Sequence, residues 1–277
     1  MAAAPPGLAL PFKVAAEPVS AAEDGGGAPM SHAYQDLLRV ARSGPGLQME
    51  DREPWRIGKL TDDYRQSAVL ILFGALDEIP SRYHEHGEGP GRDLDVLLVQ
   101  RSATLRSHPG QVAFPGGRLD PPDGDVGEVM TVPGGEVSAP HVRGALREAH
   151  EETGLDPQGV EVLGTLNPVP LPISNHMVTP VIGWWQSQSE VHVVDHAESS
   201  LVFRVPVLDL INPAHRYYAT VTRGNQTYKS PAFDVRVNET GETVTVWGFT
   251  GIVIDRILEW LDWSVEWDHN DERPAPM

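Results

Sequence analysis

The stretch LREAHEETGL, residues 146–155, places three glutamates within five positions. On an α-helix, residues three and four positions apart lie on the same face, so Glu148, Glu151 and Glu152 are expected to converge. Repulsion between their carboxylates opposes this arrangement unless a positive group lies between them. The stretch therefore raises the question of which positive group they share.

The helix that carries these glutamates is predicted to run from Ala139 to Thr153. Ser138 suits the N-cap, Pro140 suits the first turn, and Gly154 suits the left-handed position after the last turn. One side of the helix is expected to be buried, because apolar residues recur there at helical spacing: Val142, Ala145, Leu146 and Ala149.

Two interpretations of the glutamates have different functional meanings. A solvated acidic helix face is common and needs no ligand. Alternatively, carboxylates that face away from the buried side suit Mg²⁺ or Mn²⁺, which share their coordination shells with water and substrate phosphates. Arg147 lies four positions before Glu151 and can hold that carboxylate in place. This pairing on a well-delimited helix favours the metal interpretation.

Two segments resemble a known family. REAHEETGL is similar to the core of the Nudix box, G-x5-E-x7-R-E-U-x-E-E-x-G-U with U aliphatic, although Ala149 is small for the first U. The upstream segment LLVQRSATLRSHPGQVAFPGGRLD, residues 97–120, is similar to the segment that precedes the box in the coenzyme A diphosphatase branch. The resemblance covers about residues 65–262. It implies the Nudix α/β/α sandwich, in which a mixed β-sheet lies between helices.

An insertion interrupts the box. Arg147 follows Gly117 by 30 positions instead of 14, so 16 residues are inserted. Asp123 occupies the position of the first box glutamate, and the insertion follows it at about 124–139. Two valine-bearing pieces around a Pro-Gly-Gly predict a short β-hairpin or a flexible lobe on the surface. We expect the box to survive, because each doubling of loop length costs only about 0.6 kcal/mol.

The resemblance implies roles for the matching residues. Glu148, Glu151 and Glu152 would ligate the metal, and the carbonyl of Gly116 would complete the site. Arg147 would orient the glutamates. The first two glutamates and Arg147 are therefore also candidate catalytic residues.

The general base is less narrowly defined by the resemblance. It would come from the box or from a distal acid, and Glu198 matches an acidic residue that usually precedes the corresponding strand. Asp195 and Glu190 are alternatives, and Glu198 is equally compatible with ordinary loop surface. His150 lies between the metal ligands in sequence, but its helical angle turns it elsewhere, so a structural role is expected.

Basic residues gather around the glycine-rich turn at 109–117. Each one alone is compatible with a solvated charge or a structural ion pair. As a set within 18 positions they favour contact with substrate phosphates, because arginine's planar fork matches phosphate oxygens. The set consists of Arg101, Arg106, His108 and Arg118.

Composition limits the class of protein. The chain has 277 residues, 40% of them hydrophobic, and no apolar run of about 18 residues, so a buried core and no membrane span are expected. A formal net charge of −18 argues against nucleic-acid and anionic-membrane binding. With no cysteine, thiolate catalysis and disulfides are excluded. No signal peptide is recognised, and a cytoplasmic location is expected.

The rest of the chain is organised around this region. Residues 1–30 are rich in Ala, Pro and Gly and are expected to be disordered, and Ser31 is expected to begin a helix of a domain that spans 31–262. The acidic tail, 263–277, is expected to fray. Strands are predicted at 67–76 and 94–101, two more within 160–185, a strand and short helix within 200–213, and a strand followed by a helix within 243–261.

The expected function is a metal-dependent diphosphatase that cleaves coenzyme A or its thioesters to 3′,5′-ADP and 4′-phosphopantetheine or its acyl form. Other nucleoside diphosphate derivatives, such as ADP-ribose, NADH or dinucleoside polyphosphates, are a second possibility. A third is a nucleotide-binding sensor without turnover, which the complete glutamate set disfavours. The partner is therefore a small nucleotide, and a homodimer is left open.

Overall fold

The computed structural model describes residues 28–43, 61–75, 94–105, 108–237 and 240–276. Two of the sequence predictions concern residues outside these ranges: the disorder expected before residue 28 and the phosphate contact expected of Arg106. The first described helix, α1, spans Ala28–Ser43 and so begins three residues before the predicted start.

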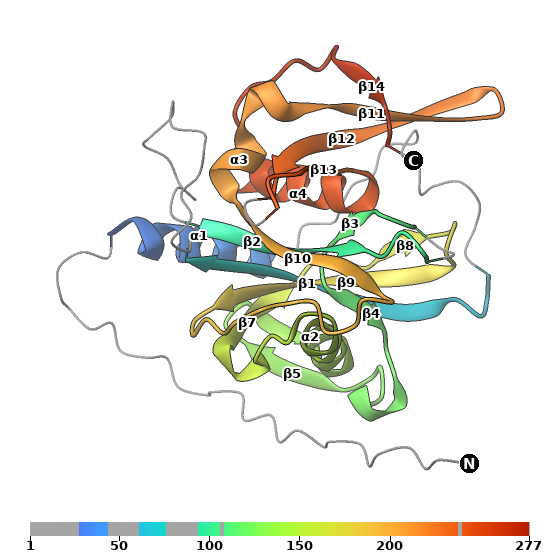
Figure 1. Cartoon of the computed structure of the whole chain (residues 1–277). Coiled ribbons are helices and arrows are strands. Elements are labelled where there is room, and N and C mark those ends of the chain that lie inside the picture. The colour runs from blue at the N-terminus through green and yellow to red at the C-terminus, as the bar shows by residue number, and fades with distance from the viewer. Residues whose placement is uncertain (1–27, 44–60, 76–93, 106–107, 238–239, 277) are drawn as a thin grey trace.

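The centre of the molecule is an eight-stranded sheet with the path β10-β2-β1-β9-β7 (Figure 1). The short strands β3, β4 and β8 pair with β2, β1 and β9, respectively. β1 and β9 are parallel, whereas the other pairs in this sheet are antiparallel. The predicted mixed sheet is therefore confirmed. Its strands are β1 Arg65–Ala75, β2 Leu94–Arg101, β3 Val112–Ala113, β4 Gly116–Arg118, β7 Val160–Thr165, β8 Val169–Leu171, β9 His176–Trp185 and β10 Ser199–Pro206.

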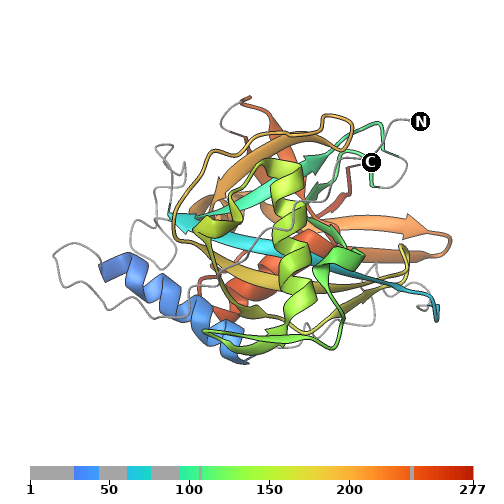
Figure 2. The same ribbon diagram turned by 90° about the horizontal axis from the view of Figure 1, so that it is seen from below.

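Helices cover both faces of this sheet (Figures 1 and 2). Leu70 and Leu72 of β1 pack with α2, Ala139–Thr153, whereas the alternate residues Ile71 and Phe73 pack with α1 and α4, Gly248–Trp260. Period-two alternation along a strand thus divides the interior into two cores. The α/β/α sandwich is confirmed. No helix in the described ranges is long and apolar enough to cross a membrane.

The predicted bounds of α2 are correct. Gly154 adopts the left-handed conformation, with φ of 72°, and its N–H donates to the carbonyl of His150. Ser138 occupies the N-cap position, but its side chain does not cap the helix. Its Oγ instead lies 2.7 Å from Nδ1 of His141. The start of the helix therefore depends on Pro140 and on packing more than on a side-chain cap.

The insertion forms the predicted hairpin from β5, Val129–Val132, and β6, Gly135–Ser138. It is not a separate surface lobe, because Val132 and Val137 are buried in the core beneath α2. The turn is also attached, since the N–H of Gly134 donates to the carbonyl of Leu163 at 2.7 Å. The insertion therefore contributes two buried valines to the hydrophobic core.

A second sheet at the C-terminal end was not predicted. Its order is β13-β12-β11-β14, with α4 against β12 (Figure 1). The strands are β11 Arg216–Arg223, β12 Gln226–Arg236, β13 Thr243–Val246 and β14 Glu272–Pro274. A short helix, α3 Val207–Ile211, leads from β10 toward it. Single turns of 3₁₀ helix occur at Pro121–Asp123, Pro157–Gly159 and Pro213–His215.

The expectation of a frayed tail is wrong for residues 263–276. Trp263 and Trp267 are 3% and 8% exposed, and β14 pairs in parallel with β11. Tryptophan burial removes a large apolar area from water, which outweighs the cost of ordering the acidic segment around it. The acidic composition of the tail concealed this anchoring.

Candidate active site

One arginine holds the glutamates of α2. Arg147 donates from the same terminal nitrogen to Glu148 Oε1 and to Glu151 Oε2, each at 3.0 Å. Its other terminal nitrogen and Nε contact Asp123 at 2.9 and 3.0 Å, and the carbonyl of Arg118 accepts a further bond at 3.0 Å. All five N–H groups of the guanidinium are therefore used. Asp123 makes the largest contribution to raising the pKa of Arg147.

Asp123 is the residue that joins the two halves of the interrupted box. It is 3% exposed, lies in the 3₁₀ turn after β4, and accepts a bond from the N–H of Asp120 at 2.8 Å. Arg143, one turn before Arg147, donates to the carbonyl of Asp123 at 3.0 Å and to Glu128 of the insertion at 2.6 Å. The 24 positions between Asp123 and Arg147 are thus bridged by direct bonds.

Glu152 is the buried member of the glutamate set. Its Oε2 accepts a hydrogen bond from the N–H of Gly116 at 3.0 Å. Burial, as the largest cause, raises its pKa to about 7, and the charges of Glu148 and Glu198 add to the shift. The Gly116 N–H and Arg101 oppose it. The Gly116 N–H and Arg101 therefore only partly compensate the effect of burial on the pKa of Glu152.

Two glycines bring β4 close to α2. A side chain at Gly117 would place its Cβ 2.4 to 2.6 Å from the carboxylate atoms of Glu148, which is far inside contact distance. The predicted metal contact of Gly116 involves its carbonyl, whereas the bond that the structure gives it is through its N–H. The Gly116 bond and the close approach at Gly117 place Glu152 and Glu148 directly against the glycine-rich strand.

The chemistry of this cluster fits a hard divalent cation. Glu148 also has a raised pKa, caused first by burial and opposed by Arg147, with Glu151 and Asp120 adding to it. Carboxylate oxygens that repel one another in partly buried positions are stabilised by a shared Mg²⁺ or Mn²⁺. Within the described ranges, however, no three acidic or histidine side chains already converge as a metal site. Arg147 bonds oxygens of Glu148 and Glu151, and the Gly116 N–H bonds an oxygen of Glu152. A cation would bind the same three carboxylates.

Arg101 and Glu198 lie close enough to the glutamates for their charges to act on one of them. The charges of both influence Glu152. The backbone of Glu198 is fixed next to Arg101, because the N–H of Ser102 donates to its carbonyl at 2.8 Å. Arg101 Nε is buried and has no hydrogen-bond partner among the described residues. Arg101 therefore places a positive charge beside the glutamates, and one of its N–H groups has no partner in the described part of the chain.

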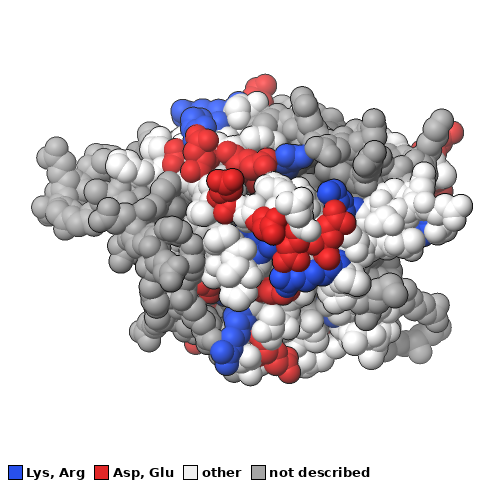
Figure 3. Space-filling model, turned by 90° about the horizontal axis from the view of Figure 1, so that it is seen from above, with Lys and Arg blue, Asp and Glu red and all other residues white. Residues whose placement is uncertain are grey.

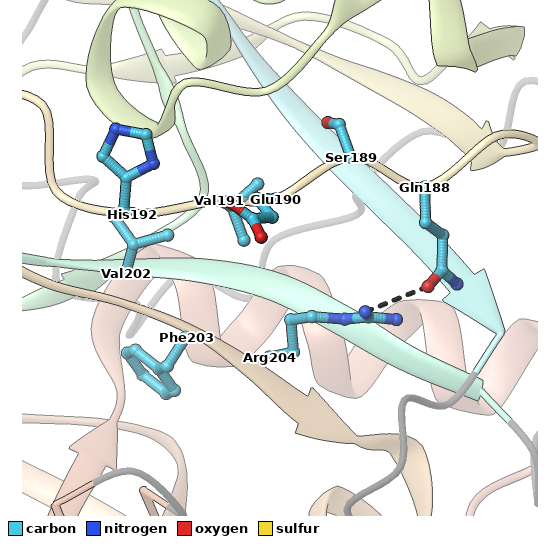
Figure 4. A pocket seen from close by; sticks show the side chains of 8 residues that line it. All are labelled: Gln188, Ser189, Glu190, Val191, His192, Val202, Phe203 and Arg204. Carbon is cyan, nitrogen blue, oxygen red and sulfur yellow. Dashed lines mark hydrogen bonds between the residues drawn. The ribbon is translucent and has the colours of Figure 1, made fainter.

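The other acids considered for the base are placed differently. Asp195 accepts the N–H of Ala197 at 2.7 Å and so shapes the turn before Glu198. Glu190 lines a cavity of about 580 Å³ between the segment 188–192 and β10, next to Arg204 (Figure 4). Arg204 is held there by Gln188, at 3.1 Å, and by Asp95, at 2.7 Å. None of the predicted site residues lines this cavity.

The charges of His108 and Arg118 act on a different residue from the charge of Arg101, which acts on Glu152. Both are exposed, and their charges act on His176, at the start of β9. Arg118 pairs with Asp120 at 3.2 Å, and His108 Nδ1 lies 2.9 Å from Gln111 Oε1. His150 has the structural role expected, since its Nδ1 lies 2.8 Å from the carbonyl of Leu155. The basic side chains that were predicted to bind substrate phosphates therefore act at two different places in the structure.

The C-terminal sheet contributes no extended basic surface among the residues described. Figure 3 shows acidic and basic side chains next to one another on the upper face. The ion pairs on this sheet have the same mixed character, for example Lys229 with Glu272 at 3.2 Å and Arg273 with Asp271 at 2.6 Å. Interspersed charges of this kind do not form the basic patch that nucleic-acid binding requires.

Comparison with known proteins agrees with the geometry. The family model described as "NUDIX domain" matches residues 87–223. The "Uncharacterized Nudix hydrolase NudL" of Photorhabdus laumondii is 32% identical over 164 residues, which cover 59% of this chain and 75% of the relative. "Nudix hydrolase 3" of Caenorhabditis elegans is 35% identical over 181 residues, covering 62% and 68%.

A crystal structure of a NUDIX hydrolase from Alicyclobacillus acidocaldarius aligns at 20% identity with a TM-score of 0.37, covering 54% of this chain and 82% of that one. The assignment depends on the sequence relatives and the family model. The chain belongs to the Nudix hydrolase family, whose members act on phosphoanhydride bonds of nucleoside diphosphate derivatives and generally use divalent metal ions.

Proposed function

We propose that this Nudix hydrolase is a diphosphatase of coenzyme A and acyl-coenzyme A. Water would cleave the phosphoanhydride to give 3′,5′-ADP and 4′-phosphopantetheine or its acyl form. The observation that carries the proposal is the position of Arg101, which belongs to the segment that resembles the coenzyme A branch. The charge of Arg101 acts on Glu152. An anionic group bound beside the glutamates would be attracted by that charge.

The proposed division of labour follows the contacts. Glu148, Glu151 and Glu152 would hold Mg²⁺ or Mn²⁺, with a backbone contribution from Gly116. When bound, such an ion neutralises charge on the phosphate oxygens and lowers the pKa of water. Arg147 would fix the rotamers of Glu148 and Glu151 through the two bonds described above.

Glu198 is the proposed acceptor of the proton from the attacking water. Its carbonyl accepts the N–H of Ser102, the residue after β2, its side chain is exposed, and its charge acts on Glu152. Glu198→Gln should lower kcat by about 10²-fold without changing metal affinity, because general-base catalysis contributes roughly that factor. Glu190→Gln, in the same segment but beside the cavity, is the matched control and should retain activity. Equal kcat values in the two variants would indicate that the general base is a residue of the Nudix box and not Glu198.

The substrate is tested by a screen of the purified protein with Mg²⁺ and with Mn²⁺. Coenzyme A, an acyl-coenzyme A, 3′-dephospho-coenzyme A, ADP-ribose, NADH and dinucleoside polyphosphates are compared by kcat/KM, with products identified by mass. The proposal predicts the highest kcat/KM for coenzyme A or its thioester. A clear preference for ADP-ribose, NADH or a dinucleoside polyphosphate contradicts the substrate class, and binding without any turnover contradicts the enzyme.

A further inference from the structure

The sheet separates two groups of cations that the sequence presents as one. Along β2, Leu97 and Val99 face α2, so Arg101, two positions further, lies on that same face. Along β1, Val69 and Ile71 face the opposite core, with α1 and α4. Ser67 continues that second series. Residues beside Ser67 are therefore on the face opposite the glutamates.

Four cationic or titratable basic residues gather around Ser67. Arg118 of β4 is its direct partner in the antiparallel register, and Arg65 pairs with His176 in the parallel register. Ser67 Oγ lies 2.6 Å from His176 Nδ1, which places that ring on the same face. His108 is close enough for its charge to act on His176. We call Arg65, His108, Arg118 and His176 the β1–β9 basic cluster.

Ser67 fixes how His176 is presented. The hydroxyl is buried, and its bond to Nδ1 holds the ring in place. If Ser67 donates, Nδ1 is the acceptor and the hydrogen is on Nε2; a protonated ring also carries a hydrogen on Nε2; and if Nδ1 of a neutral ring donates to the hydroxyl, Nε2 is an acceptor. Among the described residues, none forms a hydrogen bond with Nε2. In the first two arrangements Nε2 can donate to a group outside the protein.

The charges of the cluster are only partly balanced. Arg65 is exposed and forms no side-chain ion pair within 4.0 Å in the described part of the chain, although Asp63 lies close enough for its pKa to be lowered by Arg65. Arg118 has one exposed partner, Asp120. Burial lowers the pKa of His176, and Arg65, Arg118 and His108 lower it further. The positive charge of the cluster therefore comes mainly from Arg65 and Arg118, and in a chain with a net charge of −18 it favours an anion.

We propose that the β1–β9 basic cluster, with Ser67 positioning His176, is a binding subsite for a phosphomonoester dianion, separate from the position of the diphosphate at Arg101 and the glutamates. This inference rests on the proposed function where it takes that dianion to be the 3′-phosphate of coenzyme A. Gly117 and Arg118 are adjacent on β4 and pair with Ala68 and Ser67, so the two positions lie on opposite faces of one short strand. A separately bound phosphate ion is the other source of the same chemistry.

The first test is binding without turnover. Calorimetry compares 3′,5′-ADP, which has the monoester, with 5′-AMP, which lacks it. The wild-type protein should bind 3′,5′-ADP about 10-fold or more tightly, because a charge-assisted contact is worth at least that factor. Arg65→Gln and the double variant with His176→Asn should reduce the preference stepwise. Arg223→Gln, an exposed arginine at the end of β11, is the matched control and should retain it.

Competition with inorganic phosphate distinguishes the two sources. Phosphate that weakens 3′,5′-ADP binding in the wild type, but not in the double variant, indicates that the subsite takes the ligand's own phosphate. Phosphate that binds with an affinity sensitive to Arg65→Gln, and leaves 3′,5′-ADP binding unchanged, indicates a separate phosphate ion. No preference for 3′,5′-ADP in the wild type together with no such phosphate binding, or a preference unchanged in the double variant, overturns the subsite.

The second test uses kinetics and separates the subsite from the substrate proposal. The double variant should lose about 10- to 100-fold more kcat/KM on coenzyme A than on 3′-dephospho-coenzyme A, mainly through KM. Equal losses on both compounds contradict the subsite and leave the diphosphatase intact. A wild-type protein that hydrolyses neither compound, yet prefers 3′,5′-ADP over 5′-AMP through these residues, contradicts the substrate proposal and leaves the subsite intact.

Discussion

Arg147 and Arg216 each organise several groups through one guanidinium, but they do so in different surroundings. Arg147 bonds a buried aspartate on one side and glutamates on the other, and the side chain of Glu151 is 56% exposed. Arg216 is enclosed: its side chain is 1% exposed, it pairs with Asp255 at 2.6 Å, and it stacks on Trp267 at 4.9 Å.

The difference shows that arginine–carboxylate pairing can stabilise the fold, as at Arg216, or organise a site, as at Arg147. Around Arg216 one carboxylate balances one cation, and the remaining bonds go to Ser264 and to a backbone carbonyl. Arg147 bonds three carboxylates, those of Asp123, Glu148 and Glu151, so negative charge remains that a bound cation can neutralise. We therefore expect changes at Arg216 to affect the fold and changes at Arg147 to affect turnover.

The largest effect on stability is expected at Arg216. Arg216→Leu would leave Asp255 buried without its partner, which costs about 3–5 kcal/mol of unfolding free energy. Chemical denaturation measures the loss, and activity per folded molecule should stay near the wild-type value. Arg256→Gln, which disrupts an exposed pair with Glu259 on the same helix as Asp255, should cost less than about 1 kcal/mol. Equal costs in the two variants would remove the distinction between the enclosed and exposed pairs.

These two arginines also show what the sequence can predict. The bond of Arg147 to Glu151 connects residues four positions apart, so helical spacing predicts it, whereas the bond to the adjacent Glu148 is not predicted by that spacing. Arg216 meets Asp255 and Ser264 across 39 and 48 positions, and no local periodicity contains that information. For the same reason, Ser67 and His176, 109 positions apart, were not recognised as neighbours.

The sheet and its helices followed from apolar runs and caps, whereas the C-terminal sheet did not. β11 and β12 are rich in threonine, tyrosine and charged residues, so hydrophobicity gave little signal for them. In the tail, acidic residues masked two tryptophans that pack inward. In the site, the upstream motif located the basic residues but could not assign them to faces, because this depends on strand register.

A smaller effect is expected at Arg147, and mainly on catalysis. Arg147→Lys keeps the charge but loses the planar fork, so it cannot hold Asp123, Glu148 and Glu151 together. We expect kcat/KM to fall on the order of 10²-fold, because misplaced ligands disturb the reacting geometry. Arg143→Lys, one helical turn away, keeps the Arg147 bonds and serves as the control. If both lysine variants have the same kcat/KM, Arg147 does not organise the site.

The smallest effect is expected in the inserted hairpin. Val137→Ala should cost about 1–2 kcal/mol of unfolding free energy, since it removes two buried methyl groups from the core beneath α2. Val129→Ala changes an exposed valine of the same hairpin and should cost less than about 0.5 kcal/mol. Activity per folded molecule should be retained in both. A loss of turnover in Val137→Ala at unchanged stability would instead link the hairpin to the site.

The central claim is that the glutamates facing β4 hold a catalytic divalent cation. The most direct measurement is kcat for the best substrate of the screen as a function of Mn²⁺ concentration, in the wild type and in Glu151→Gln and Glu152→Gln, with Glu136→Gln of the hairpin as control. We expect both site variants to retain the fold and to lose on the order of 10²-fold or more in kcat, with weaker Mn²⁺ activation. Wild-type rates and unchanged Mn²⁺ dependence in both would contradict the account.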